Sequence, residues 1–429
     1  MTALPPALSL YRLASGLAAP LAPALLSSRA AKGKEDESRV AERLGRASLP
    51  RPEGSLVWIH GASVGESRVA LTLAGALIAA RPGLNVLLTS GTVTSAALVG
   101  REAPPGVIHQ YIPADTPGAA RRFAAHWKPD VAVFVESELW PNLILETARS
   151  GARLALVNAR MNESSLRRWQ RWQRSGKALV GLFDWISPAD GRTARGLGQL
   201  LGRKLSVAGN LKLEILPPMP SRDKLAAART IVNGRPLWVA ASTHAGEEEI
   251  VLDAHQHLLA RHRDALLILV PRHPDRASAI GNLMEQRQLG FALRSRREAP
   301  GQDTPVWLAD TLGEMSLWFE LAPVALIAGS LKPAIGGHNP IEATRLGCPV
   351  ISGPWRDSFS DIFDAYETYG AVTTVQDAAG LAEAVRRHWA GEGAGISAGQ
   401  AALSALTGNV LETTTRKLLA LVDTPAEKS

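Results

Sequence analysis

Residues 58–67 are Trp-Ile-His-Gly-Ala-Ser-Val-Gly-Glu-Ser, between an apolar run over residues 56–60 and a helical pattern over residues 67–80. The apolar run predicts a strand, and the glycines let the chain turn sharply and leave room for a ligand. We therefore expect Glu66 at the N-terminus of a helix, where the dipole favours its carboxylate and readies it to accept a proton. A first-turn glutamate that only stabilises the helix is the alternative.

Outward from this segment, apolar runs alternate with helical patterns along the chain. The expected strands cover residues 56–60, 85–89, 107–112, 131–135, 154–158 and 185–187, then 237–241, 265–270, 306–309, 324–327 and 349–351. Continuous apolar runs of this kind are typical of strands buried on both faces of a parallel sheet. The alternation predicts an α/β fold with two doubly wound, Rossmann-like domains facing across a cleft.

The expected domain boundary is a proline-rich connector at residues 216–221, with prolines at 217, 218 and 220. It separates a first domain over residues 37–215 from a second over residues 222–429, with the last helix free to pack back on the first domain. A chain of 429 residues is long enough for two such domains.

The composition is that of a globular enzyme with a basic balance. The formal net charge is +7 and the pI is about 9.7, which suits nucleic acid, an anionic membrane or an acidic substrate. The basic residues form no known nucleic-acid-binding module, which argues against a nucleic-acid partner. The single cysteine, Cys348, excludes an internal disulfide and a zinc site built on several thiolates.

The N-terminal segment, residues 1–36, differs from the rest. Arg12 is its only charged residue between positions 2 and 28, several prolines interrupt it, and Arg29, Lys32 and Lys34 follow. These features predict a membrane-associated segment that faces anionic lipid. A packed or frayed helix is the alternative.

Two carboxylates, Glu136 and Glu138, follow the expected strand 131–135. If the strand continued, their spacing would put both on one side. Buried carboxylates need partners, so Glu136 is a candidate to bind a hydroxyl or a cation, and helix capping is the alternative. Lys212, just before the connector, is placed to neutralise a leaving group, unless it is simply exposed.

A basic helical stripe is expected within residues 162–177, because Arg167, Arg171 and Arg174 fall at helical spacing. The stripe suits an anionic headgroup or a phosphorylated acceptor. A solvated charged face is the commoner explanation of such a pattern.

In the second domain, several turns at strand ends suit phosphate binding. Arg272 follows one strand and can bind phosphate through two hydrogen bonds. A Thr-x-x-Glu capping pattern ends at Glu314. Asn339 is expected as an N-cap with Pro340 as first helical residue, so Glu342 either caps or contacts a ribose. Together these turns predict a nucleotide site.

Other ligand motifs are missing from the sequence. It has no P-loop and no Gly-x-Gly-x-x-Gly fingerprint. It offers no Asp-x-Asp pair for a metal diphosphate, and its histidines lack metal-ligand spacing. We therefore expect neither a cofactor nor a catalytic metal.

Taken together, the motifs resemble the 3-deoxy-D-manno-octulosonic acid (Kdo) transferases of lipopolysaccharide synthesis. The matching segments, in order, are residues 62–66, 136–142, 158–160, 209–212, 271–274, 313–315 and 337–342. The resemblance implies an inverting glycosyltransferase of the GT-B fold, with an acceptor-binding first domain and a CMP-sugar-binding second domain. It implies CMP-Kdo as donor, lipid IVA (a phosphorylated, acylated disaccharide) as acceptor, and the cytoplasmic side of the inner membrane as location.

The resemblance also assigns roles by position. Glu66 matches the general base that deprotonates the acceptor hydroxyl, and Glu136 and Lys212 match positions that stabilise the transition state. The expected donor contacts are Pro271, Arg272, Gly313, Glu314, Met315, Asn339, Pro340, Ile341 and Glu342. The expected acceptor contacts are Ser63, Gly65, Arg167, Arg171 and Arg174.

Two alternatives to a Kdo transferase remain open from the sequence. One is another GT-B nucleotide-sugar enzyme, such as a UDP-sugar epimerase. The other is a non-catalytic protein that binds a nucleotide sugar.

Overall fold

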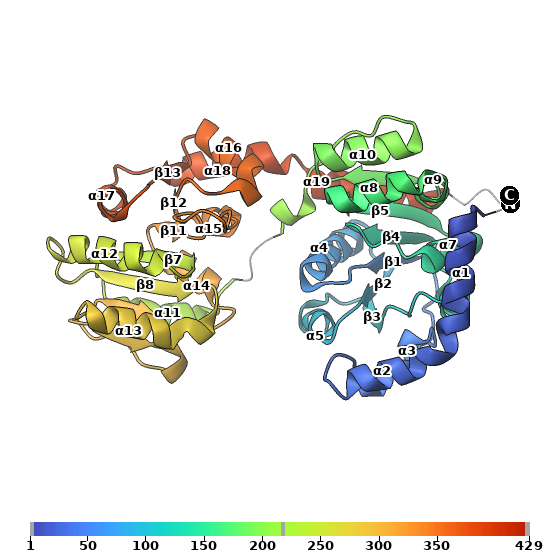
Figure 1. Cartoon of the computed structure of the whole chain (residues 1–429), viewed down its shortest axis with the longest axis horizontal. Coiled ribbons are helices and arrows are strands. Elements are labelled where there is room, and N and C mark those ends of the chain that lie inside the picture. The colour runs from blue at the N-terminus through green and yellow to red at the C-terminus, as the bar shows by residue number, and fades with distance from the viewer. Residues whose placement is uncertain (1–3, 216–218, 425–429) are drawn as a thin grey trace. The chain divides into compact units, whose positions relative to one another are not determined.

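The structure is a computed structural model that describes residues 4–215 and 219–424 (Figure 1). Three short parts of the chain lie outside the described residues. They are residues 1–3 of the expected N-terminal segment, residues 216–218 of the expected linker and residues 425–429 at the end of the expected second domain.

The chain forms two compact units. The first holds residues 1–215 together with residues 407–429, and the second holds residues 216–406. The last helix, α19 (Val410–Asp423), therefore belongs with the first unit. Glu214 ties it there, because its carboxylate accepts the backbone N–H groups of Val410 and Leu411.

The first unit contains a six-stranded parallel sheet in the order β3-β2-β1-β4-β5-β6. Its strands are β1 (Leu56–His60), β2 (Asn85–Ser90), β3 (Val107–Tyr111), β4 (Val131–Val135), β5 (Arg153–Ala159) and β6 (Trp185–Pro188). The winding direction reverses between the adjacent strands β1 and β4. Ligands bind at the carboxyl ends of strands beside such a switch point, and the loops holding Glu66 and Glu136 both begin there.

Both faces of this sheet are buried, which explains the continuous apolar runs. Val57 and Ile59 of β1 pack on the side of α19 and α4 (Val64–Ala80). Leu56 and Trp58 pack on the other side with Phe123 of α6 (Pro117–Trp127). The helices of this unit are α1 (Pro6–Ala18), α2 (Ala22–Ala30), α3 (Val40–Arg43), α4 (Val64–Ala80), α5 (Val93–Glu102), α6 (Pro117–Trp127), α7 (Pro141–Arg149), α8 (Glu163–Arg171), α9 (Gln173–Val180), α10 (Gly191–Leu201) and α19.

The second unit contains a seven-stranded parallel sheet in the order β13-β12-β11-β7-β8-β10-β9. Its strands are β7 (Leu237–Thr243), β8 (Leu266–Pro271), β9 (Phe291–Leu293), β10 (Val306–Leu308), β11 (Ala325–Ile327), β12 (Val350–Ser352) and β13 (Val372–Thr374). Its helices are α11 (Arg222–Val232), α12 (Glu247–Leu259), α13 (Ala277–Gln286), α14 (Met315–Leu321), α15 (Ile341–Arg345), α16 (Ser360–Thr368), α17 (Ala378–Trp389) and α18 (Ile396–Thr407). The expected α/β class with two doubly wound parallel sheets is confirmed.

The N-terminal segment is helical and lies on the first unit. Helix α1, the short 3₁₀ turn Ala19–Leu21 and α2 follow one another, and the 3₁₀ turn holds Pro20. Within the residues that the structure describes, no helix has the length and apolar character needed to cross a bilayer.

Candidate active site

Glu66 lies in the turn between β1 and α4 and caps the helix. Helix α4 begins at Val64, three residues earlier than expected, and Ser63 is its N-cap. The Ser63 hydroxyl accepts the backbone N–H of Glu66 at 3.3 Å, and Glu66 Oε2 accepts those of Ala62 at 2.8 Å and Ser63 at 3.4 Å. This reciprocal arrangement is a capping box. The helix-stabilising alternative is therefore part of what Glu66 does.

Capping uses only one of the two carboxylate oxygens of Glu66. Both of its hydrogen bonds end on Oε2, so in the described part of the chain Oε1 accepts none. Gly61 makes the turn possible, because a β-carbon there would lie 2.8 Å from the backbone of Glu66.

The pKa of Glu66 shifts in the direction opposite to the one expected from the helix terminus alone. Burial raises the pKa of its carboxyl group, and the negative charges of Glu138 and Glu136 raise it further. These effects outweigh the hydrogen bond from Ala62, which lowers the pKa, so the helix terminus does not dominate. A carboxylate with a raised pKa is a stronger base than an ordinary glutamate, which suits proton abstraction.

Glu138 is held by two aromatic residues. The Trp140 indole donates to Glu138 Oε2 at 2.7 Å, and His60 Nε2 lies 3.7 Å from the same oxygen. Burial raises the pKa of Glu138, but His60 and Trp140 outweigh it and the net direction is down. His60 itself is fully buried and its Nδ1 contacts Thr89. His60 was not predicted as a partner of Glu138 because only the fold brings it there, whereas Trp140 lies two residues from Glu138 in the chain.

Glu136 forms an ion pair with Lys212. Lys212 Nζ lies 2.5 Å from Glu136 Oε1, and the Glu136 side chain is only 13% exposed. The strand β4 ends at Val135, and Glu136 has a left-handed backbone with φ of 62°. The strand does not continue past Val135, so the condition under which Glu136 and Glu138 would lie on one side is not met. The chain turns at Glu136, and the two carboxylates have separate partners.

Two asparagines position the lysine. Asn158 Oδ1 accepts the backbone N–H of Leu211 at 2.9 Å, and Asn210 Oδ1 accepts that of Lys212 at 3.0 Å. A β-carbon at Gly65 would lie 3.9 Å from Lys212 Nζ, so the lysine lies beside the Glu66 turn. Three sequence-predicted segments that are distant in the chain thus meet at one edge of the first sheet.

The arginines do not lie on one helix as expected. The helix is interrupted at Trp172, which is the C-cap of α8 and the N-cap of α9. Its backbone has φ of −105° and ψ of 45°. Arg167 and Arg171 lie on α8 and Arg174 lies on α9. Arg167 pairs with Glu163 at 3.1 Å, whereas Arg168, which the sequence did not single out, lines a cavity.

The candidate donor residues follow neighbouring strands of the second sheet. Pro271 ends β8, and the exposed Arg272 after it donates its backbone N–H to Thr243 at the end of β7. Gly313, Glu314 and Met315 follow β10, which pairs with β8.

Glu314 is already bound by another side chain. Arg294 Nε and Nη2 donate to its two carboxylate oxygens at 3.0 and 2.9 Å, and the Thr311 hydroxyl donates at 2.7 Å. Arg294 is the main reason that the pKa of Glu314 is lowered. Helix α14 begins at Met315 with Glu314 as its N-cap residue, so the capping box expected from Thr311 is not formed.

The helix at Asn339 begins one residue later than expected. Helix α15 starts at Ile341 with Pro340 as N-cap, so Pro340 is not the first helical residue and Glu342 is the second rather than the third. Asn339 still caps, because its Oδ1 accepts the backbone N–H of Ile341 at 3.1 Å.

A histidine pair that the sequence did not predict lies in the same unit. His244 Nε2 lies 2.8 Å from His338 Nε2, and the rings are stacked. The buried Glu247 accepts the backbone N–H groups of His244, Gly329 and Leu331, which joins the loops after β7 and β11. Burial lowers the pKa of both histidines, that of His338 to about 4. Neutral rings can donate and accept at this pair.

The fold and the first-unit site together define the class of protein. Paired doubly wound sheets of this kind form the GT-B fold of glycosyltransferases and nucleotide-sugar epimerases. The chain is similar in fold to a putative UDP-N-acetylglucosamine 2-epimerase from Listeria monocytogenes, with a TM-score of 0.57, 12% identity, and coverage of 86% of this chain and 96% of that one. At that identity the likeness shows the fold alone.

Sequence comparison gives the family. Residues 38–215 match the family model of 3-deoxy-D-manno-octulosonic-acid transferase (kdotransferase). The chain is 35% identical over 388 residues to a probable mitochondrial 3-deoxy-D-manno-octulosonic acid transferase of Arabidopsis thaliana, over 88% of this chain and 86% of the relative. It is 37% identical over 350 residues to the corresponding transferase of Bordetella pertussis, over 78% and 80%. The chain belongs to the 3-deoxy-D-manno-octulosonic acid transferase family, which confirms the resemblance.

Proposed function

We propose that this protein transfers Kdo from CMP-Kdo to lipid IVA, with inversion at the anomeric carbon. The observation that carries the proposal is the turn at Glu66. It holds a carboxylate with a raised pKa beside the Lys212–Glu136 ion pair, in a chain of the Kdo transferase family. One oxygen of that carboxylate accepts no hydrogen bond from the residues that the structure describes.

In the proposed reaction Glu66 is the general base. It takes the proton of the acceptor hydroxyl while that oxygen attacks the anomeric carbon of Kdo, and the bond to the CMP phosphate breaks on the opposite face. The single displacement inverts the centre, and the proton stays on Glu66 until it is lost to solvent. Ser63 and Gly65 border the acceptor, and Glu136 and Lys212 stabilise the developing charge.

The second unit is the proposed donor site. CMP leaves as a phosphate monoester, and Arg272 is suited to its charge because the guanidinium can donate two hydrogen bonds. The backbone around Gly313 and Met315, and Asn339 to Glu342, provide the other proposed contacts. Glu314 would act mainly through its backbone while its carboxylate stays bound to Arg294.

We propose the cytoplasmic side of the inner membrane as the site of action. The acceptor is a lipid. An exposed row of leucines along α1, the following 3₁₀ turn and α2 offers an apolar surface, and the exposed Lys32 and Lys34 follow it in the chain. Such a combination suits an anionic lipid interface.

The test is to incubate the protein with CMP-Kdo and lipid IVA and weigh the lipid by mass spectrometry. A mass gain of at least one Kdo is expected, and the new linkage should show inverted configuration by NMR. A lipid of unchanged mass would reject the proposed acceptor and donor together. Release of UDP or a change at C2 of a UDP-sugar would instead favour an epimerase, whose fold this chain shares.

A further inference from the structure

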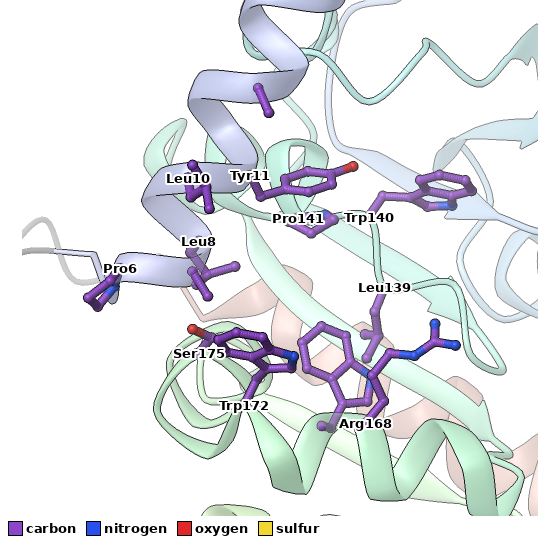
Figure 2. Close-up of a pocket in the computed structure, with 13 residues that line it drawn as sticks. Pro6, Leu8, Leu10, Tyr11, Leu139, Trp140, Pro141, Arg168, Trp172 and Ser175 are labelled. Atoms are coloured by element: carbon purple, nitrogen blue, oxygen red, sulfur yellow. The ribbon is translucent and has the colours of Figure 1, made fainter.

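A cavity of about 740 Å³ lies within the first unit, between α1 and the break that separates α8 from α9 (Figure 2). Leu8 and Leu10 of α1 form one side of it. Trp169 and Trp172 form the other, and Leu139 and Trp140 close the side nearest β4. Most of the lining is apolar, with Tyr11, Arg168 and Ser175 contributing polar groups. The volume lies within the range of small-molecule sites, about 300–1,000 Å³.

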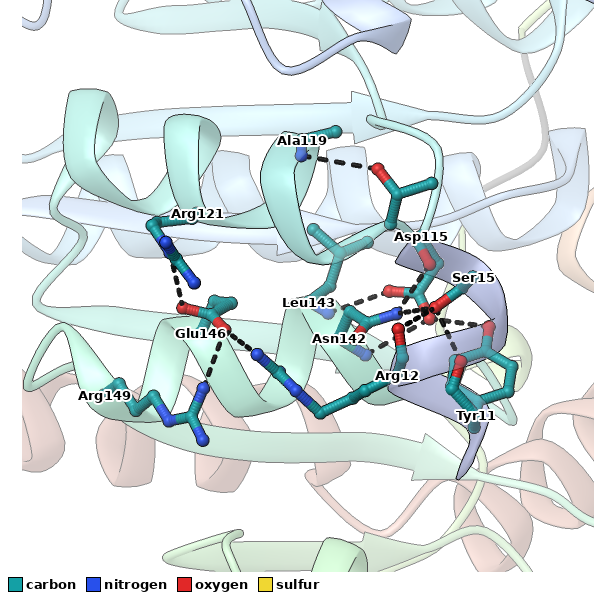
Figure 3. Close-up of polar contacts among 11 residues, drawn as sticks. Tyr11, Arg12, Ser15, Asp115, Ala119, Arg121, Asn142, Leu143, Glu146 and Arg149 are labelled. Carbon is teal, nitrogen blue, oxygen red and sulfur yellow. Dashed lines mark hydrogen bonds and ion pairs between the residues drawn. The ribbon is translucent and has the colours of Figure 1, made fainter. Parts of the chain in front are cut away.

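Helix α1, which lines this cavity, is held in place by polar contacts with the rest of the first unit (Figure 3). Arg12 Nη2 pairs with Glu146 Oε1 at 2.7 Å, and the Tyr11 hydroxyl donates to Asp115 Oδ2 at 2.9 Å. Leu8 is also buried against the core of the unit. Polar contacts to the α6 and α7 region and one apolar anchor therefore hold the helix on the domain.

Helix α1, the 3₁₀ turn Ala19–Leu21 and α2 together present an apolar row to the outside. The exposed leucines, each between 60% and 74% exposed, are Leu10, Leu13, Leu17, Leu21 and Leu25. Their spacing of three or four residues puts those of one helix on one face. Leu10 belongs both to this row and to the cavity lining, so the apolar surface runs into the cavity. Contiguous exposed apolar surface of this kind marks a site of interaction.

The cavity also borders the candidate active site. Trp140 lines it and donates to Glu138, whose charge acts on Glu66. Arg168 lies at its edge and makes no ion pair within residues 4–215 and 219–424. The apolar part of a ligand in the cavity would thus lie between tryptophans, and an anionic group of the ligand would lie near Arg168. The rest of the ligand would extend toward the carboxylates of Glu138 and Glu66.

We propose that this cavity binds one acyl chain of the lipid acceptor, with Arg168 placed for a phosphate of the same molecule. This inference rests on the proposed function, because the lipid is the substrate that would need such a site. An acyl chain is apolar along its length, which matches the lining, and it enters from an apolar surface, which matches the leucine row. The cavity would hold the acceptor with its sugar toward Glu66.

The matched variants are Ala14→Phe and Ala18→Phe. Ala14 lines the cavity, whereas Ala18 lies one turn further along α1 and does not, and both are exposed. Kinetics are measured with lipid IVA and with the same disaccharide stripped of its acyl chains. For Ala14→Phe we expect the KM for lipid IVA to rise at least fivefold, with kcat, the KM for CMP-Kdo and the use of the stripped acceptor nearly unchanged. Ala18→Phe should match the wild type throughout. An unchanged KM for lipid IVA in Ala14→Phe would overturn the proposal.

A second measurement does not depend on transfer. A brominated single-chain fatty acid quenches indole fluorescence on contact, and three tryptophans line the cavity. We expect quenching of the wild type and of Ala18→Phe, and clearly weaker quenching of Ala14→Phe. If the wild type transfers no Kdo but quenching follows this pattern, the proposed function fails and the acyl site stands. Equal quenching in all three proteins would reject the acyl site. If Ala14→Phe binds anionic vesicles less well but keeps the wild-type KM for lipid IVA, the acyl site is also rejected, in favour of a general membrane contact.

Discussion

Lys212 Nζ lies 2.5 Å from Glu136 Oε1, although Glu136 follows β4 and Lys212 lies in a 3₁₀ turn just before the second unit begins. The pair joins the end of a central strand to the end of the first unit. Both side chains are partly shielded from solvent. Removing either one therefore leaves a partly buried charge without its ion-pair partner.

The first prediction concerns this pair. Lys212→Met and Glu136→Gln should each lower kcat by about 100-fold, because each removes a charge near the reacting centre. The double variant should lose little more than either single one, since the two residues act as a unit. The measurement is a double-mutant cycle on kcat, with thermal unfolding of each variant as the folding control. Losses that simply multiply would show that the ion pair has no joint role.

The second prediction separates capping by Glu66 from catalysis. Ser63→Ala removes the cap acceptor and should destabilise the protein by about 1 kcal/mol while kcat stays within tenfold of wild type. Glu66→Ala removes the other half of the capping box and should cost about 0.3–1 kcal/mol, yet it should abolish turnover. Thermal unfolding and turnover are measured on the same samples. If both variants lose activity in proportion to stability, Glu66 only caps the helix.

Local patterns were enough to predict most of the fold but not the geometry of the site. The strand over residues 131–135 was found to the residue because a run buried on both faces is apolar throughout. The strands Phe291–Leu293 and Val372–Thr374 were missed because they are the two edge strands of the second sheet, and neither is buried along its whole length. Glu66 was placed at its helix terminus because capping is a local rule, and Asn339 likewise.

The long-range partners of the site residues could not be predicted from the sequence. Nothing near Glu136 in the chain indicates Lys212, and nothing near Trp140 indicates the cavity that α1 completes. The prediction of a single arginine stripe was wrong for a different reason. Helical spacing assumes an unbroken helix, and the backbone turns at Trp172.

The third prediction is a pH dependence. The charge of Glu138 raises the pKa of Glu66, and a general base must be deprotonated to act, so kcat/KM should fall on the acid side through this raised pKa. Glu138→Gln removes that charge, lowers the pKa of Glu66 and should move the acid limb to lower pH. A pH profile of kcat/KM for both proteins checks this. If the acid limb of the Glu138→Gln profile stays in place or moves to higher pH, Glu138 does not raise the pKa of Glu66.

The fourth prediction concerns His338, whose pKa is lowered to about 4 mainly by burial and then by His244 and Arg272. An unfolded histidine has a pKa near 6.5, so between about pH 6.5 and 4 the folded protein binds fewer protons than the unfolded one. The contribution of His338 to stability is therefore present above pH 6.5 and is lost as the pH falls toward 4, by about 1–2 kcal/mol after allowance for its partial exposure. His338→Asn should melt below the wild type at pH 7.5, because the contact with His244 is lost, and the two should converge near pH 4.5. Calorimetry at both pH values measures the difference. A gap that stays constant or widens in acid would mean that the pair does not depend on neutral rings, and that the loops after β7 and β11 are held by Glu247 alone.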